Sequence, residues 1–382
     1  MNKNLNEQIN WLDYKYQFVK RNKHWDHDQS YELKSNNNKI RLLENDILLK
    51  ISHDIVTNIC HEQIGINNFA DYEIPNINIE QMKKIVINFF TDINPKLTDK
   101  ITYILTKTTF NKYDDTKPND NQRSFINKDG INFYYKSDLK SLMSLAHEIS
   151  HAIAATDDYG NICNNNKVDL FNEVESLLTE QLFLEYLRKN NLQVKEKSIK
   201  SDIHFLDKND INNIKYNKLK NIIFLSYRAI DELEFKKLMK NRKVKKIDSK
   251  LINDIAQKTK LKQEIIILRI NKFIDEYYPS DSLTHNFLED NYDLKNGRHL
   301  SNESRFIYGW CLVEKFNNMN LSDEQKIDFY RKYLENAKYL SFQNILELFN
   351  VNILDLSDFS YEFINSFNFL TRQADFNITE KR

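Results

Sequence analysis

One pentapeptide in the sequence combines the residue types and the spacing of a metal site: His147-Glu148-Ile149-Ser150-His151. Residues four apart lie on the same face of a helix, so the imidazoles of His147 and His151 can reach one ion. Glu148 follows the first histidine and can take a proton from a water molecule that this ion activates. The pattern predicts a zinc ion used for hydrolysis.

The pentapeptide falls within a predicted helix that is apolar on one side. Ser137 or Asp138 can cap its first turn. The apolar positions recur every three or four residues, at Leu139, Leu142, Met143, Ala146, Ile149 and Ile153. A polar group without a partner is costly on a buried helix, which disfavours the alternative of two histidines that merely face solvent.

Such a site needs a third protein ligand and an open fourth position. The next predicted helix, residues 169–188, offers Glu173, which shares a face with Leu177 and Glu180. Glu173 can therefore bind the ion while Glu180 holds a ligand histidine from behind. Glu175 is expected to point away, into solvent. The plain alternative is that Glu173 and Glu180 are charged residues of an outer helix face.

Asp157 is a second candidate for the third ligand. It stands six residues after His151, where the HExxHxxGxxH pattern places its last ligand. However, Ala154 occupies the position of the glycine at which chains of that pattern turn. Glu173 is therefore the preferred third ligand.

These segments resemble the thimet oligopeptidase and oligopeptidase F metallopeptidases, whose two hallmark helices read LxHExGHAxH and E(V/I)xSxxxE. This chain reads LAHEISHAIA and then EVESLLTE. The resemblance implies a helical zincin-type fold of the kind with HExxH plus glutamate, one zinc ion per chain held by His147, His151 and Glu173, and Glu148 as the base. Ser150 replaces the usual glycine, and the last histidine of the first pattern is absent.

The resemblance extends from about residue 77 to residue 354 and leaves out most of the family's N-terminal half. It also implies groups that stabilise the oxyanion of the reaction, namely Tyr308 and His299. Trp310 stands where the family has a second tyrosine. His285 is the alternative histidine, and Tyr308 is alternatively a packed helix aromatic.

Composition predicts a mainly α-helical chain, because 5 glycines and 4 prolines in 382 residues cannot serve many hairpin turns. Helices are expected over 78–90, 216–240, 251–278 and much of 301–367, with a break at 35–38 in a helical N-terminal region. Residues 131–135 predict a strand of a small sheet beside the zinc helix, and they resemble the edge strand on which zincins place an extended peptide. An edge with no ligand is equally compatible. We expect an N-terminal helical segment over 1–75 and a catalytic domain over 76–370.

Charge and cysteine content favour a cytoplasmic protein with no nucleic-acid or membrane partner. There are 55 basic and 55 acidic residues, so no net charge attracts an anionic polymer. The sequence shows no apolar stretch long enough for a signal peptide or a membrane span. The 3 cysteines lack the spacing of a disulfide framework or a thiolate site. The oligomeric state is not indicated.

The function favoured by these patterns is that of a zinc endopeptidase, a hydrolase that cleaves peptides with a Glu148-activated water. One alternative is a catalytically degenerate relative that binds peptides or a partner protein. Another is a protein-cleaving toxin or effector on the same zinc fold.

Overall fold

The computed structural model describes most of the chain. The described residues are 5–21, 35–59, 71–116, 122, 124–127, 130–155, 173–197, 202–241, 246–259, 262–264, 266–267, 270–271, 301–337, 340, 342–351 and 360–371. Three candidate site residues, Asp157, His285 and His299, lie outside them.

The described part is mainly α-helical, which confirms the predicted fold class. The helices are α1 (Leu5–Arg21), α3 (Ser35–Asn58), α4 (Ile79–Ile93), the 3-10 helix η2 (Pro95–Leu97), α5 (Thr98–Thr106), α6 (Leu139–Ala155), α7 (Val174–Lys189), α8 (Lys208–Asn241), α9 (Ser249–Thr259), α13 (Ser301–Asn317), α14 (Asp323–Asn336) and α15 (Phe342–Leu348). The strands are β1 (Tyr72–Glu73), β2 (Thr109–Lys112), β3 (Phe125–Asn127), β4 (Gly130–Tyr135), β5 (Gln193–Glu196) and β6 (His204–Phe205). The predicted break at 35–38 is wrong, because these residues form the first turn of α3. Serine and asparagine are common where helices begin.

The chain divides into two compact units, each of which combines two stretches of sequence. Unit 1 comprises Met1–His53 and Leu225–Ser304, and unit 2 comprises Asp54–Phe224 and Arg305–Arg382. Unit 1 has a hydrophobic core of its own, formed by Ile9, Leu12, Ile247, Ile252, Ile255, Ile266, Ile267 and Ile270. The strands and helices α4 to α7 belong to unit 2. The division predicted between residues 75 and 76 stays a prediction.

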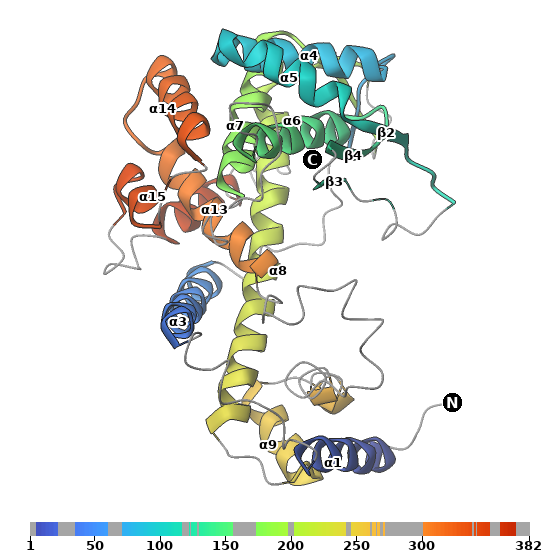
Figure 1. Cartoon of the computed structure of the whole chain (residues 1–382), viewed down its shortest axis with the longest axis vertical. Helices are drawn as coiled ribbons and strands as arrows, with labels where there is room; N and C mark the ends of the chain where they lie inside the picture. Colours follow the sequence, from blue (N-terminus) through green and yellow to red (C-terminus); the bar gives the residue numbers. More distant parts are fainter. Residues whose placement is uncertain are drawn as a thin grey trace, which may run out of the picture. The chain divides into compact units, whose positions relative to one another are not determined.

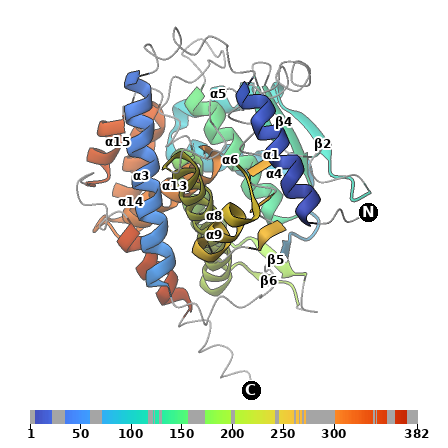
Figure 2. The ribbon, with the colours of Figure 1, turned by 90° about the horizontal axis from the view of Figure 1, so that it is seen from below.

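The small sheet beside α6 has the strand order β2-β4-β3. Strand β4 is parallel to β2 and antiparallel to β3, and Asn132 pairs with Thr109 on one side and Phe125 on the other. The expectation that residues 131–135 form an edge is therefore wrong, since β4 is the middle strand. The edge strands read TFNK and FIN, which are too short to stand out in the sequence. Figures 1 and 2 show α5 and α6 next to β4.

A glycine allows β4 to begin close to the end of α5. Gly130 has φ +141°, and a Cβ added to it would lie 2.0 Å from the carbonyl oxygen of Lys107. Other residues carry a Cβ that cannot fit there and rarely adopt this φ. The sheet is thereby held against α5.

Helix α6 begins directly after a buried aspartate, Asp138, which is one of the two residues predicted to cap it. The Asp138 carboxylate accepts a hydrogen bond from the backbone N–H of Ser141 at 2.8 Å, and the Asp138 carbonyl accepts one from that of Leu142 at 3.1 Å. Lys197 lies 3.4 Å from the other carboxylate oxygen. The predicted apolar positions of α6 are buried, and α6 packs against α7 and the sheet (Figure 1).

The second sheet, with order β1-β5-β6, fixes the start of α8. The Tyr72 hydroxyl donates to Asp210 Oδ1 at 2.9 Å, and His204 Nε2 lies 3.0 Å from Asp210 Oδ2. Asp207 caps the helix by accepting from the backbone N–H groups of Asn209 and Asp210 at 2.7 and 2.9 Å. These contacts fix the position of the N-terminal end of α8 within unit 2.

In the part of the chain that the structure describes, no helix combines the length and the apolar character needed to cross a membrane.

Candidate metal centre

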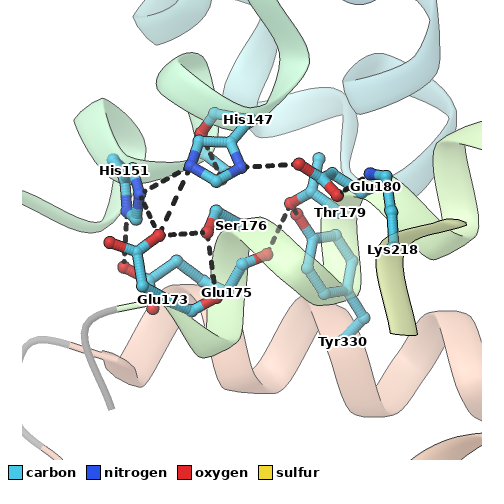
Figure 3. A network of polar contacts seen from close by, with 10 residues as sticks. His147, His151, Glu173, Glu175, Ser176, Thr179, Glu180, Lys218 and Tyr330 are labelled. Atoms are coloured by element: carbon cyan, nitrogen blue, oxygen red, sulfur yellow. Dashed lines mark hydrogen bonds and ion pairs between the residues drawn. The ribbon is translucent and has the colours of Figure 1, made fainter. Parts of the chain in front are cut away.

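Helices α6 and α7 bring three predicted ligands together (Figure 3). His147 Nε2 and His151 Nε2 are 3.1 Å apart. Glu173 Oε2 lies 3.4 Å from the first and 3.3 Å from the second of these nitrogens. The three atoms thus form a nearly equilateral triangle.

This triangle has the dimensions of one face of a zinc coordination tetrahedron. Zinc bonds of roughly 2.0–2.1 Å to nitrogen and oxygen at tetrahedral angles separate neighbouring ligand atoms by about 3.3–3.4 Å. Two imidazoles and a carboxylate are also the donor set of many catalytic zinc sites, which keep a fourth position open. The residues present therefore fit a zinc ion.

Glu173 is held where it can serve as a ligand. It directly precedes α7, and its carbonyl accepts a hydrogen bond from the backbone N–H of Leu177 at 3.0 Å. The Ser176 hydroxyl lies 2.9 Å from that carbonyl and 3.2 Å from Glu173 Oε2. Serine at this position orients the carboxylate as well as the helix end.

Each ligand histidine also contacts a second carboxylate, at its Nδ1 atom. Glu180 Oε1 lies 2.8 Å from His147 Nδ1, and Glu175 Oε1 lies 3.2 Å from His151 Nδ1. A carboxylate at Nδ1 accepts a proton from that nitrogen and leaves the Nε2 lone pair directed at the ion. The arrangement matches the carboxylate–histidine–metal pairs of known metal sites.

The position of Glu175 corrects the expectation that it points into solvent, because its side chain is 1% exposed and faces His151. The error has a geometric cause. Helical spacing turns Glu175 away from Glu173, but that part of α7 packs against α14 and is not open to solvent. The signal that could have found its role is the second glutamate itself, since a ligand histidine commonly has a carboxylate at its other ring nitrogen.

Three further side chains of the cluster, those of Thr179, Tyr330 and Lys218, were not predicted. Thr179 donates to the carbonyl of Glu175 at 2.6 Å and also forms a hydrogen bond with the Tyr330 hydroxyl of α14. Lys218 of α8 forms an ion pair with Glu180 Oε2. Figure 3 shows Lys218 next to Glu180, and Tyr330 next to Thr179.

The cluster has an excess of negative charge. With the carboxylates of Glu173, Glu175 and Glu180 ionised, the ammonium group of Lys218 charged and both imidazoles neutral, the charge would be −2. Burial alone lowers the pKa of His147, but hydrogen bonds to Glu173 and Glu180 outweigh it and raise that pKa to about 10. The pKa of His151 rises to about 9 because hydrogen bonds to Glu173 and Glu175 likewise outweigh burial. Two protons or one divalent cation would balance this charge.

The pKa values of the carboxyl groups shift in the opposite direction to those of the histidines. Burial raises the pKa of Glu173, but the hydrogen bonds from His147 and His151 lower it well below its usual value. Burial likewise opposes the ionisation of Glu180, yet Lys218 and His147 lower its pKa to about 2. Both groups are ionised at neutral pH, as metal binding and support of a ligand histidine require.

Glu148 is not one of the three clustered ligands. It directly follows His147 on α6, and its side chain is partly exposed. Among the described residues, no hydrogen bond or ion pair engages its carboxylate. It therefore remains available to a water molecule or a substrate.

Helix α13 lies against the start of α7. A Cβ added to Gly309 would lie 2.7 Å from Leu177 Cδ1 and 3.7 Å from Glu173 Cβ. Tyr308, its neighbour and a predicted oxyanion donor, is 2% exposed, as is Trp310. The structure places Tyr308 on the helix that contacts the third ligand; its role stays a prediction, as does that of His299.

Comparison of the sequence with protein-family models and with curated proteins finds no match. Solved structures with 10% sequence identity do match the chain. One is assigned as an oligoendopeptidase F from Bacillus anthracis str. Ames, with a TM-score of 0.47 over 96% of this chain and 58% of that one. PZ peptidase A, solved with an inhibitor, gives 0.48 over 95% and 61%. Another structure assigned as oligoendopeptidase F gives 0.47 over 96% and 61%. The chain is thus similar to oligoendopeptidase F and PZ peptidase A structures, and it spans about three fifths of their length.

Proposed function

We propose that the chain is a zinc-dependent endopeptidase that hydrolyses peptide bonds, with one zinc ion held by His147, His151 and Glu173. The observation that carries the proposal is the triangle of Nε2, Nε2 and Oε2 atoms, 3.1–3.4 Å on a side. Its size, donor set and charge suit a divalent ion.

Zinc bound at this site supplies a Lewis acid for a carbonyl oxygen and makes water more acidic. Glu148 then acts as the general base, accepting the proton of the attacking water and passing it to the amine that leaves. Glu175 and Glu180 hold the two imidazoles in the required tautomer. Tyr308 and His299 are the proposed donors to the oxyanion.

The test compares the wild type with Glu148→Gln on peptides of graded length, with products identified by mass spectrometry and zinc content by elemental analysis. Glu347→Gln, an exposed glutamate of α15, is the matched control. We expect the wild type and the control to cleave, and Glu148→Gln to lose about 10²–10⁴-fold in turnover because the base is gone. All three proteins should retain zinc.

Equal cleavage by Glu148→Gln would overturn the proposed mechanism. Zinc binding without cleavage by the wild type would overturn the peptidase assignment and favour a peptide-binding protein. A wild type that binds no zinc and cleaves nothing would overturn the metal site itself.

A further inference from the structure

Lys218 connects α8 to the metal centre through a glutamate. Its ammonium group pairs with Glu180 Oε2, while Glu180 Oε1 lies 2.8 Å from His147 Nδ1. The side chains of Lys218, Glu180 and His147 are 26%, 14% and 14% exposed. One carboxylate is therefore held at both of its oxygens, by a lysine on one side and by a ligand histidine on the other.

The preceding turn of α8 makes a second contact of the same kind. Lys215 Nζ lies 2.8 Å from Glu314 Oε2 on α13, and the Glu314 side chain is fully buried. Helix α8 thus supplies one ammonium group to α7 and another to α13. Only the first of these pairs continues to a predicted metal ligand.

We propose that Lys218 is a positioning residue of the metal centre, which fixes Glu180 and through it the orientation of His147. This inference rests on the proposed function, since it requires that His147 binds a metal ion. A carboxylate with a single partner can rotate, whereas one bound at both oxygens presents one acceptor direction to Nδ1. His147 Nε2 then stays aimed at the other two ligand atoms.

The pair Lys218 and Lys215 provides its own control. Lys218→Met and Lys215→Met each remove one ammonium group from α8 and keep a long apolar side chain. Zinc affinity is measured by competition with a chromogenic chelator, and the ligand field by the visible spectrum after loading with Co²⁺. Unfolding of the metal-free proteins is followed by circular dichroism.

We expect Lys218→Met to bind zinc about 10–100-fold more weakly, the usual effect of losing a group that orients a ligand. Its Co²⁺ spectrum should change as well. Lys218→Arg, which keeps a cation for Glu180, should recover part of the affinity. Lys215→Met should lower the stability of the metal-free protein and leave zinc affinity and the Co²⁺ spectrum as in the wild type.

Unchanged zinc affinity and an unchanged spectrum in Lys218→Met would overturn the inference. Tighter binding would overturn it too, because the lysine would then act only as a charge that opposes the ion. If Lys215→Met weakens zinc binding as much as Lys218→Met does, the effect is a general one of α8, and this too would overturn the inference. If Lys218→Met fails to fold, Lys218→Gln takes its place with the same expectations. A wild type that binds no zinc would instead overturn the proposed function.

Discussion

The two ligand histidines are held by carboxylates in different surroundings. Glu180, behind His147, is paired with Lys218 at the end of α8 that lies in unit 2. Glu175, behind His151, is almost fully buried in the contact between α7 and α14, where burial and its negative charge raise the pKa of the Tyr330 and Tyr333 hydroxyls. The two imidazoles can therefore be perturbed one at a time.

Glu175→Gln should weaken zinc binding about 10-fold or more, because an amide is a poorer acceptor for the Nδ1 proton of His151 and can present its NH₂ group instead. Competition with a chelator measures the change. Glu185→Gln, on the same helix but 44% exposed, is the control and should bind zinc as the wild type does. Equal affinities in all three proteins would show that Glu175 has no influence on the metal.

Zinc binding should release close to two protons at neutral pH. The pKa values of His147 and His151 are raised to about 10 and about 9, so both imidazoles carry a proton in the metal-free protein at pH 7. Zinc binds only the neutral form, so its apparent affinity should rise with pH until about pH 9–10. Calorimetry in buffers of different ionisation enthalpy counts the protons. Release of none would contradict the raised pKa values.

The same pKa shifts give the metal-free protein a stability that depends on pH. Because the folded-state pKa values lie above the ordinary value of 6.5, this stabilisation is complete below pH 6.5 and is lost as the pH rises through about 9–10. Zinc should remove the dependence, since bound imidazoles no longer titrate.

At the scale of elements, α13 approaches the start of α7 closely at Gly309, beside Leu177 and Glu173. Gly309→Ala would place a methyl group 2.7 Å from Leu177 Cδ1, inside normal contact distance. Overpacking costs about 1–3 kcal/mol, against the roughly 1 kcal/mol gained by alanine in a helix, and the buried Leu177 side chain must shift to admit the methyl group. We therefore expect a net destabilisation of about 1 kcal/mol and weaker zinc binding, measured by urea denaturation and chelator competition. A more stable protein with unchanged affinity would contradict the packing described.

The elements that could be predicted are those whose apolar spacing is visible in the sequence. The spacing of Met82, Val86 and Phe89 predicts α4, and the capped apolar face around His147 predicts α6. Strand β2 could not be found in this way, because its partners in β4 lie 23 residues further along the chain. Strand β3 pairs with nearby residues of β4, but its 3 residues are too few to show an alternating pattern. Glu175 was wrongly predicted to face solvent for a related reason: the side chain that it contacts, His151, belongs to another helix.

At the scale of the whole molecule, the three predicted ligands lie in unit 2, whereas unit 1 has a separate hydrophobic core. Low glycine and proline content predicted a helical chain. Units built from two separated stretches could not be read from sequence, because composition does not change where the chain passes from one unit to the other. The two units are defined by contacts between residues that lie far apart in the sequence.

Removal of zinc should lower hydrogen-exchange protection in α6 and α7 and leave the core of unit 1 around Ile252 and Ile255 unchanged. A ligand present at 1,000 times its dissociation constant stabilises the state that binds it by about 4 kcal/mol. Hydrogen exchange with mass spectrometry, with and without a chelator, locates that difference along the chain. An equal loss of protection in both units would show that they unfold together.

The two glycines among the described residues limit which substitutions this sequence can accept. The chain contains 5 glycines in 382 residues, well below the usual share of about 7%. A Cβ at Gly130 would lie 2.0 Å from the carbonyl oxygen of Lys107, a backbone atom, and the φ of +141° disfavours any other residue. A Cβ at Gly309 would meet the end of the Leu177 side chain, which has to shift to admit it. Even in a background this poor in glycine, we expect Gly130 to tolerate no other residue, because a replacement would displace the start of β4 and with it the small sheet.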